Sequence, residues 1–210
     1  MANPPPVPEL IHIPGPCGQL EAIVESADAP RGVVVVCHPH PQHGGTMTNK
    51  VAHTLARSGY ESGLVSVRFN YRGVGHSAGE YDNGVGETDD ALAVVQWAQA
   101  RWPSLPLYLA GFSFGGGVAL RSALRTACVG LVTVAPAIAR DPPPEELPQC
   151  PWLLIQGDAD DVVPAPMVLQ WVEGLKVKPV VTVLEGAGHF FHGRLVDLRE
   201  IVSSWIGERF

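Results

Sequence analysis

The sequence predicts an α/β fold in which a mostly parallel central sheet is covered by helices on both faces. Three observations lead to this prediction. Short apolar segments rich in β-branched residues alternate with segments of helical spacing, which is the pattern of strand–helix–strand units. Hydrophobic residues make up 46% of the chain and charged residues 17%, which gives a large core and excludes an intrinsically disordered protein. The length of 210 residues suits a single domain spanning 1–210.

The first half of the chain supplies three strands and two helices. Leu20–Val24 is a short apolar strand, and Gly32–Cys37 (GVVVVC) is the uninterrupted apolar run of a strand buried on both faces. Met47–Ser58 repeats apolar residues at helical spacing, and Leu64–Phe69 returns to the strand pattern. Glu87–Arg101 is expected to be a helix because its apolar residues share one face. These residues are Ala91, Leu92, Val95 and Ala98.

The second half continues the same alternation. The strands expected here are Pro106–Ala110, Val129–Val134, Trp152–Gln156 and Val180–Leu184. The helices expected here are Gly116–Ala127, a helix that Pro164 opens, and Phe191–Phe210. Pro164 suits the first turn of a helix because its missing N–H has no partner there anyway.

Two proline-rich stretches lie outside these elements. The N-terminus, residues 1–8, is expected to be an extended proline-rich arm, and Asp141–Pro148 a rigid loop. Met1–Leu10 lacks the basic and then apolar pattern of a signal peptide. No apolar run approaches the roughly 18–20 residues of a membrane span. The expectation is therefore a cytoplasmic protein with no membrane partner.

Charge and cysteine content exclude further classes. The chain has 14 Lys and Arg against 21 Asp and Glu, a net charge of −7, whereas a nucleic-acid-binding protein usually has a basic excess. The four cysteines, Cys17, Cys37, Cys128 and Cys150, contain no CxxC pair, so zinc ribbons and thioredoxin-like sites are not expected. They are interpreted as buried thiols. The apolar composition mildly favours a homodimer.

The first candidate for chemistry follows the strand Pro106–Ala110. Gly111-Phe112-Ser113-Phe114-Gly115 is a G-x-S-x-G pattern between a strand and a helix. A serine on such a tight turn is strained and exposed, and the flanking glycines must be small because backbone passes close to them. The N-terminus of the following helix favours a developing negative charge. Ser113 is therefore the expected nucleophile.

A second match to this pattern, Gly75-His76-Ser77-Ala78-Gly79, lacks the context. No strand directly precedes it and no helix directly follows it. Ser77 is interpreted as part of a glycine-rich turn.

A serine nucleophile needs a base, and the base needs an acid that orients it. Three carboxylates, Asp158, Asp160 and Asp161, follow the strand Trp152–Gln156, and we expect Asp160 rather than Asp161 to be the acid. One or two of the three are expected only to form a solvated turn or to cap the next helix.

The expected base is His189, in the loop after the strand Val180–Leu184. The competing histidine, His192, is expected inside the first turn of the last helix, where its side chain has less freedom to point at the site.

An oxyanion hole needs two backbone N–H donors. One is expected from Phe114, the residue after the nucleophile. The other is expected in the loop that follows the strand Gly32–Cys37, where Pro39 and Pro41 have no N–H to donate. His40 is the candidate there.

These stretches together resemble the α/β-hydrolase family, and more narrowly its small, lidless bacterial serine hydrolases. The resemblance covers nearly the whole chain and is carried by CHPHPQHGGTMTNKV (37–51), RFNYRGVGHSAGEYDNGVGE (68–87), GFSFGG, GDADDVVP (157–164) and GAGHFFHG (186–193). It implies an α/β-hydrolase fold with a Ser–His–Asp triad. Many relatives have His-Gly where this chain has His38-Pro39, which leaves the second oxyanion donor open.

The resemblance also locates a missing element. Many relatives insert a helical cap between the sixth and seventh strands, but here the strands Val129–Val134 and Trp152–Gln156 are joined by residues 135–151, too few for a cap domain. An open, shallow site follows, in which small acyl groups bind without strong selection. Aromatic residues expected near the site include Phe112, Phe114, Phe190, Phe191 and Trp152. Phe112, Phe190 and His38 are the expected substrate-binding residues.

The function expected from these residues is hydrolysis of small carboxylic esters through an acyl-enzyme, without a metal or other cofactor. A thioesterase or another acyl-transfer enzyme would use the same triad. A non-catalytic binding protein of the same fold is a further alternative, although such proteins usually lack a triad residue. The spacing of His38, His40 and His43 also resembles the start of a dinuclear metal site, but Gln42 stands where such sites carry Asp.

Overall fold

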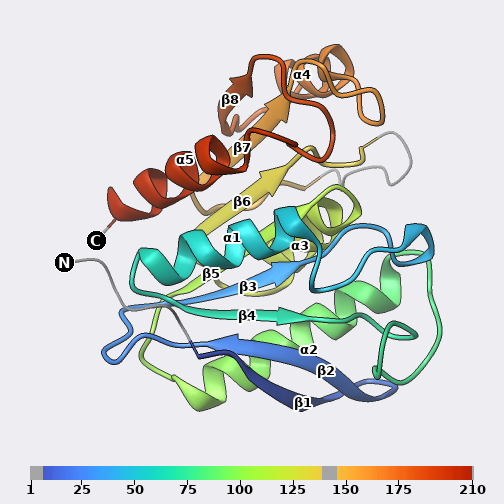
Figure 1. The fold of residues 1–210 in the computed structure, drawn as a ribbon, viewed down its shortest axis with the longest axis vertical. Coiled ribbons are helices and arrows are strands. Elements are labelled where there is room, and N and C mark those ends of the chain that lie inside the picture. The colour runs from blue at the N-terminus through green and yellow to red at the C-terminus, as the bar shows by residue number, and fades with distance from the viewer. Residues whose placement is uncertain (1–6, 139–145, 210) are drawn as a thin grey trace.

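The computed structural model describes residues 7–138 and 146–209. Its strands form one eight-stranded sheet in the order β1-β2-β4-β3-β5-β6-β7-β8 (Figure 1). The strands are β1 (Glu9–Gly15), β2 (Gly18–Glu25), β3 (Val33–Cys37), β4 (Val65–Phe69), β5 (Leu107–Phe112), β6 (Gly130–Val134), β7 (Trp152–Gly157) and β8 (Val180–Leu184). The helices are α1 (Lys50–Glu61), α2 (Val85–Arg101), α3 (Phe114–Arg125), α4 (Ala165–Glu173) and α5 (Leu195–Gly207), with a short 3₁₀ turn at Pro41–His43.

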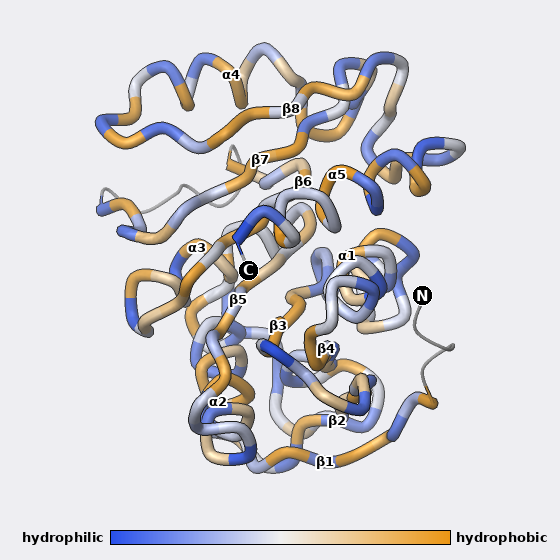
Figure 2. Tube along the Cα trace, turned by 90° about the vertical axis from the view of Figure 1, so that its left-hand side faces the viewer, coloured by the Kyte–Doolittle hydropathy of each residue, from blue (hydrophilic) through white to orange (hydrophobic). Residues whose placement is uncertain are grey.

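The sheet lies between two layers of helices. Helices α1 and α5 pack on one face, and α2, α3 and α4 pack on the other (Figure 2). Strand β3 is buried on both faces: Val33 and Val35 belong to the core beneath α2 and α3, whereas Val34 and Val36 belong to the core beneath α1. This arrangement explains why the strand is apolar at every position, since both of its faces are covered.

Strand pairing is parallel from β4 through β3 to β8 and antiparallel at the other edge. The predicted α/β fold with a mostly parallel sheet is confirmed. All strands predicted from the sequence are present, and their ends differ from the predicted ones by at most two residues. The carboxyl ends of the parallel strands share one edge of the sheet, and the loops that leave them form the candidate site.

The sequence interpretation missed β1. This strand forms a hairpin with β2 through the Gly15–Gly18 turn, where Gly18 has a φ of +124°. Only Ile13 of this strand is buried and most of its other residues are exposed, as expected of a strand at the edge of a sheet. The prolines at positions 4–6 and 8 predicted an extended arm, and the strand that begins directly after them, at Glu9, was not recognised as a separate element. Residues 1–6 of that arm and 141–145 of the Asp141–Pro148 loop lie outside the described residues.

Helix boundaries differ more than strand boundaries. Helix α1 starts at Lys50 rather than at Met47, because the Asn49 side chain accepts hydrogen bonds from the N–H groups of Val51 and Ala52 and so caps the helix. Helix α5 starts at Leu195 rather than at Phe191, which has a φ of +52° and therefore cannot belong to a right-handed helix.

The connection between β6 and β7 spans residues 135–151 and is too short for a cap domain, as predicted. Within the described parts of the chain, no helix combines the length and the apolar character that crossing a membrane requires.

Candidate active site

Ser113 lies at the sharp turn between β5 and α3. Its φ of +56° and ψ of −119° place it in a region that non-glycine residues rarely adopt. Two backbone hydrogen bonds hold it there: its N–H donates to Val134, and its carbonyl accepts from Ala137. The strain is thus maintained by the end of β6, and it projects the hydroxyl from the sheet edge toward the loops.

The glycines on either side of Ser113 are required by close backbone contacts. A Cβ on Gly111 would lie 2.0 Å from the carbonyl oxygen of Gly115, and a Cβ on Gly115 would lie 2.3 Å from that of Cys37. Both oxygens belong to backbone that cannot move aside cheaply. The tight turn therefore brings α3 directly against the end of β3.

His189 joins Ser113 to Asp160. Its Nε2 lies 3.1 Å from the Ser113 hydroxyl, and its Nδ1 lies 2.8 Å from Oδ2 of Asp160. All three side chains are largely buried. Because a carboxylate only accepts hydrogen bonds, Nδ1 carries the proton and Nε2 is left to accept one from the serine. The structure thus brings together three residues that the sequence placed after three different strands.

The Asp160 carboxylate is held in its ionised form. Burial opposes its ionisation, but hydrogen bonds from His189 and from the backbone N–H groups of Val163 and Val162 outweigh burial, so the pKa of Asp160 lies below its usual value. Gln156 donates a further hydrogen bond to Oδ2 at 3.1 Å. A fixed negative charge therefore faces the imidazole of His189.

The competing residues lie elsewhere. Asp161 is exposed, and Asp158 accepts a hydrogen bond from the N–H of Gly186 at the turn after β8. His192 is exposed and lies in the turn before α5, not inside the helix as predicted. Its ring stacks on Phe190. Asp160 and His189 are thus the members of these two groups that meet Ser113.

Phe114 is the first residue of α3, so its N–H belongs to the helix end at which backbone donors lack helical partners. Beside it lies the loop that follows β3. The His40 ring packs on the Phe114 ring with centroids 4.9 Å apart, and the His40 carbonyl accepts from the N–H groups of His43 and Gly45. The two residues proposed to donate their N–H groups are therefore neighbours at the mouth of the turn.

His38 was expected to contact substrate, and the structure corrects this. Its side chain is fully buried, with Nδ1 donating to the Pro39 carbonyl at 2.7 Å and Nε2 accepting from the N–H of Tyr71 at 3.3 Å. Burial lowers the pKa of His38 to about 3, so the ring is neutral at physiological pH. His38 supports the loop from beneath and does not face the pocket.

Phe112 also lies away from the pocket surface. It is fully buried, and its ring packs against the rings of His189 and Phe190 from behind. Phe190 lines the pocket as expected, with 47% of its surface exposed. Phe191 and Trp152, also considered as apolar walls, are buried in the core. Of the three residues expected to bind substrate, the structure brings only Phe190 to the site.

The pocket above Ser113 has a volume of about 470 Å³. One wall is polar and is formed by loops after β3 and β4; it includes His40, His43, Asn49, Tyr81 and Asn83. The other wall is apolar and is formed mainly by loops after β6, β7 and β8; it includes Ala137, Val162, Val163, Pro164, Met167 and Phe190. Among the described residues that line it, none is Lys, Arg, Asp or Glu.

The sequence interpretation missed three polar residues of this pocket, Asn49, Tyr81 and Asn83. Tyr81 and Asn83 follow β4 by more than ten positions, in a glycine-rich segment without local periodicity. Asn49 lies in a stretch that the resemblance covered, but the residues around it showed no catalytic pattern. These residues could have been found from their place in loops that follow buried parallel strands, because such loops reach the edge of the sheet where sites form.

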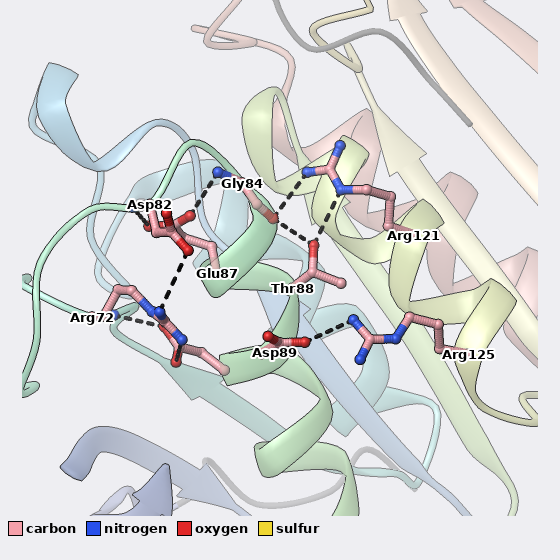
Figure 3. A network of polar contacts seen from close by, with 9 residues as sticks. Arg72, Asp82, Gly84, Glu87, Thr88, Asp89, Arg121 and Arg125 are labelled. Atoms are coloured by element: carbon pink, nitrogen blue, oxygen red, sulfur yellow. Dashed lines mark hydrogen bonds and ion pairs between the residues drawn. The ribbon is translucent and has the colours of Figure 1, made fainter. Parts of the chain in front are cut away.

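The segment that carries Tyr81 and Asn83 is anchored by a polar network (Figure 3). Arg72 donates from Nε and Nη2 to the two carboxylate oxygens of Asp90, which is fully buried on α2. Glu87 accepts from the N–H groups of Asp82 and Gly84 at 2.9 and 2.7 Å. These contacts fix both ends of the segment and so hold one wall of the pocket in place.

Ser77, in the second G-x-S-x-G match, is structural. Its hydroxyl donates to the Asn70 carbonyl at 2.7 Å and accepts from the N–H of Glu21 at 2.9 Å. The positive φ values of Gly75 and Gly79 show that this motif is a turn, as the sequence context predicted.

The three histidines of the H-x-H-x-x-H pattern do not converge. The ring nitrogens of His38 are both engaged beneath the loop, and His40 accepts from the N–H of Gln42 at 3.2 Å and contacts the Tyr81 hydroxyl at 3.3 Å. In residues 7–138 and 146–209, no group of three or more His, Cys, Asp or Glu could hold a metal ion.

Comparison with known proteins places this chain among α/β serine hydrolases. A family model described as serine aminopeptidase, S33, matches residues 28–150. The chain is 43% identical to an alpha-beta serine hydrolase homologue from Coxiella burnetii, with a TM-score of 0.89 over 93% of this chain and 96% of that one. It is 37% identical to a serine hydrolase without lid from Xanthomonas campestris, with a TM-score of 0.92 over 100% and 98%. An uncharacterized protein of Rickettsia prowazekii is 31% identical over 93% of this chain and 87% of its own.

Proposed function

This chain belongs to the serine aminopeptidase S33 family of α/β-hydrolases, and from that premise we propose that it hydrolyses small, uncharged carboxylic esters through an acyl-enzyme on Ser113. The observation that carries the proposal is the position of His189, which reaches Ser113 with one ring nitrogen and Asp160 with the other. That arrangement costs stability, because it requires a strained serine and a buried carboxylate, and a catalytic role accounts for its presence.

The first half of the reaction forms the acyl-enzyme. His189 Nε2 takes the hydroxyl proton of Ser113 while the Oγ attacks the ester carbonyl carbon. The imidazolium that results is stabilised by the ionised Asp160, which accepts from Nδ1. His189 then gives the proton to the departing alkoxide, the carbon–oxygen bond of the ester breaks, and the alcohol leaves.

The oxyanion of the tetrahedral intermediate is bound by the N–H of Phe114 and by the N–H of His40. The Phe114 donor lies at the N-terminus of α3, where the helix dipole favours negative charge. The His40 donor is supported by its loop, since Pro39 and Pro41 on either side have no N–H and His38 holds the Pro39 carbonyl from below.

The second half of the reaction regenerates the enzyme. Water gives a proton to His189 Nε2 and attacks the acyl carbonyl carbon, and the Ser113 Oγ leaves with that proton as the carboxylic acid forms. The pocket is open to solvent, so water reaches the acyl-enzyme without a conformational step.

Pocket size and charge favour a small neutral ester over a peptide with a free N-terminus. About 470 Å³ suits a small acyl group together with a small alcohol. A free α-ammonium group would need a carboxylate partner, and the described residues of the pocket wall supply none. The polar wall suits hydrogen bonds from a hydroxyl or carbonyl of the substrate, and the apolar wall suits an alkyl or aryl group. A thioester would react by the same steps, and the test below includes one.

The experiment that tests the proposal is labelling with a fluorophosphonate probe, followed by tryptic mapping. Ser113 lies in the peptide 102–121, and fragmentation distinguishes it from Ser104 in the same peptide. The label is expected on Ser113 in the presence or absence of a chelator. Ser113→Ala is the control and is expected to take up no label.

Activity is then measured with p-nitrophenyl esters of increasing acyl length, with an acetyl thioester, and with alanine p-nitroanilide. We expect the short esters to give the highest kcat/KM and the anilide to be a poor substrate. A folded protein that takes no label and cleaves none of these compounds would instead support a non-catalytic binding protein of this fold.

A further inference from the structure

Two cysteines far from the candidate active site lie in contact. The Sγ atoms of Cys128 and Cys150 are 3.1 Å apart, although the residues are 22 positions apart in the chain. Cys128 precedes β6 and Cys150 precedes β7, and these two strands pair in parallel. Neighbouring strands run about 4.8 Å apart, which suits the Cα separation that a disulfide needs.

Backbone contacts hold the two residues at this separation. The N–H of Leu131 donates to the Pro151 carbonyl at 2.9 Å, which joins the two segments one residue after Cys150 and three residues after Cys128. Bond formation therefore needs a change of side-chain rotamer and little backbone movement.

Both thiols are accessible from solvent. Each is partly exposed, and they lie together in a groove at the amino ends of the strands, opposite to the Ser113 edge of the sheet. The groove is bordered by the end of α3, by residues 146–151 and by the segment after α4. A small disulfide or peroxide can therefore reach the pair. By contrast, Cys37 is fully buried in the core, and burial raises the pKa of its thiol to about 12.

The pair has an internal division of roles. The Cys128 thiol donates its proton to the Cys150 sulfur, which lowers the pKa of Cys150 and raises that of Cys128. Cys150 is thus the sulfur of the pair that ionises more readily, and thiolate is the attacking species in disulfide exchange.

We propose that Cys128 and Cys150 form a reversible redox pair that low-molecular-weight disulfides oxidise to an intramolecular disulfide. The Cys150 thiolate attacks one sulfur of oxidised glutathione, the glutathione S–S bond breaks, and one glutathione thiolate leaves. Cys128 loses its proton and attacks Cys150 in the mixed disulfide, which expels the second glutathione. Two electrons pass from the pair to the oxidant, and the two thiol protons end on the two glutathione thiols.

The bond acts on stability and not on catalysis. It ties the amino ends of β6 and β7, whereas Ser113, Asp160 and His189 lie at the carboxyl ends of their strands. The ring that it closes restricts the unfolded chain and so favours the folded state. We expect the thermal midpoint of the oxidised protein to exceed that of the reduced protein by about 5–10 °C, with esterase kcat/KM unchanged within twofold.

The test is treatment of the native, full-length protein with oxidised glutathione, followed by alkylation of free thiols and tryptic digestion without reduction. The pair lies in the peptides 126–140 and 141–176, so the disulfide is detected as these two peptides joined, and dithiothreitol separates them. Recovery of both peptides in alkylated form after oxidation would refute the proposal, and so would a link from either cysteine to a second chain.

Matched variants test the division of roles. Cys128→Ser is expected to accumulate a glutathione adduct at Cys150, and Cys150→Ser to be modified at Cys128 at least tenfold more slowly. Neither variant should show a redox-dependent thermal midpoint, whereas Cys17→Ser, which removes the exposed thiol elsewhere, should behave as wild type. Equal adduct rates at both cysteines would overturn the assigned roles, and a redox-dependent midpoint in Cys128→Ser would show that the stabilisation has another source.

Discussion

A Cβ on Gly111 would lie 2.0 Å from the carbonyl oxygen of Gly115, so the first glycine of the nucleophile turn is required by the backbone of the second. The sequence pattern reflects this contact directly. The serine between them keeps its strained conformation because the glycine two positions away on each side lets backbone pack directly against backbone.

This contact predicts the effect of adding one methyl group. Gly111→Ala and Gly115→Ala are each expected to lose about 3 kcal/mol or more in the free energy of unfolding, because backbone on both sides must move. Gly207→Ala in α5, where no atom would meet the added carbon, is the control and should change stability by less than about 0.5 kcal/mol. Urea denaturation measures all three. A small effect at Gly111 or Gly115 would show that the turn tolerates a different geometry.

The two G-x-S-x-G motifs predict opposite consequences of the same substitution. Ser113→Ala should reduce kcat/KM by at least about 10³-fold and leave the thermal midpoint nearly unchanged. Ser77→Ala should retain activity but lose about 1–3 kcal/mol of stability, because it leaves the buried N–H of Glu21 without its acceptor. Ester hydrolysis and chemical denaturation of both variants separate the two roles. Comparable losses of activity in both would contradict the assignment of Ser113.

Asp160 and Asp161 are adjacent, and only Asp160 contacts His189. Asp160→Asn is expected to lower kcat by roughly 10³–10⁴-fold, because an amide can hold the imidazole in the wrong tautomer and provides no charge for the imidazolium. Asp161→Asn changes an exposed side chain and should stay within about twofold of wild type. Steady-state kinetics at neutral pH is the measurement. If Asp161→Asn proves the more damaging of the two, the acid has been assigned to the wrong residue.

Two aspartates of α2, Asp89 and Asp90, pair with arginines from other elements but differ in burial, and Figure 3 labels the exposed pair, Asp89 and Arg125. Asp90 is fully buried and receives two hydrogen bonds from the Arg72 guanidinium, whereas Asp89 and Arg125 are about half exposed. Asp90→Ala should cost about 3–5 kcal/mol, because it leaves a buried guanidinium with only the longer contact to the exposed Asp82, at 3.8 Å. Asp89→Ala should cost less than about 1 kcal/mol. Denaturation curves for the two variants test the contrast, and similar values would mean that burial does not control these pairs.

His38 predicts a pH dependence of stability. Its folded-state pKa of about 3 lies below the value near 6.5 of an unfolded histidine. Between these two values the unfolded state binds a proton that the folded state does not, so this group makes stability fall as the pH is lowered, by up to about 1.4 kcal/mol per pH unit. Its contribution is fully present above about pH 6.5 and levels off below about pH 3.

The control for this prediction is His38→Gln, which keeps an acceptor for the N–H of Tyr71 and does not titrate. The variant should be less stable than wild type at pH 7 but should lose stability less steeply on acidification. Parallel curves of unfolding free energy against pH for the two proteins would exclude His38 as the source of the slope.

Periodicity predicted most of the fold because burial on two faces leaves a strong local signal. Gly32–Cys37 has to be apolar at every position, and it could be recognised without knowing its neighbours. Strand β1 has one exposed face and follows a run of prolines, so its pattern was weak. The start of α1 after Asn49 was missed, because an N-cap depends on the hydrogen bonds of one side chain and not on a repeating pattern of apolar residues.

The sequence by itself determined the order of the elements and the candidates Ser113, Asp160 and His189, because each follows a strand whose carboxyl end must reach the same edge of a parallel sheet. Only the tertiary structure decided which side chains face the pocket. Phe112 and His38 stand next to site residues in the chain but point into the core, whereas Tyr81 and Met167 come from distant loops. The contact between Cys128 and Cys150 likewise exists only because β6 and β7 are neighbours. The local pattern of apolar and polar residues indicates whether a segment is buried. The direction of a single side chain depends on the residues from elsewhere in the chain that pack against it.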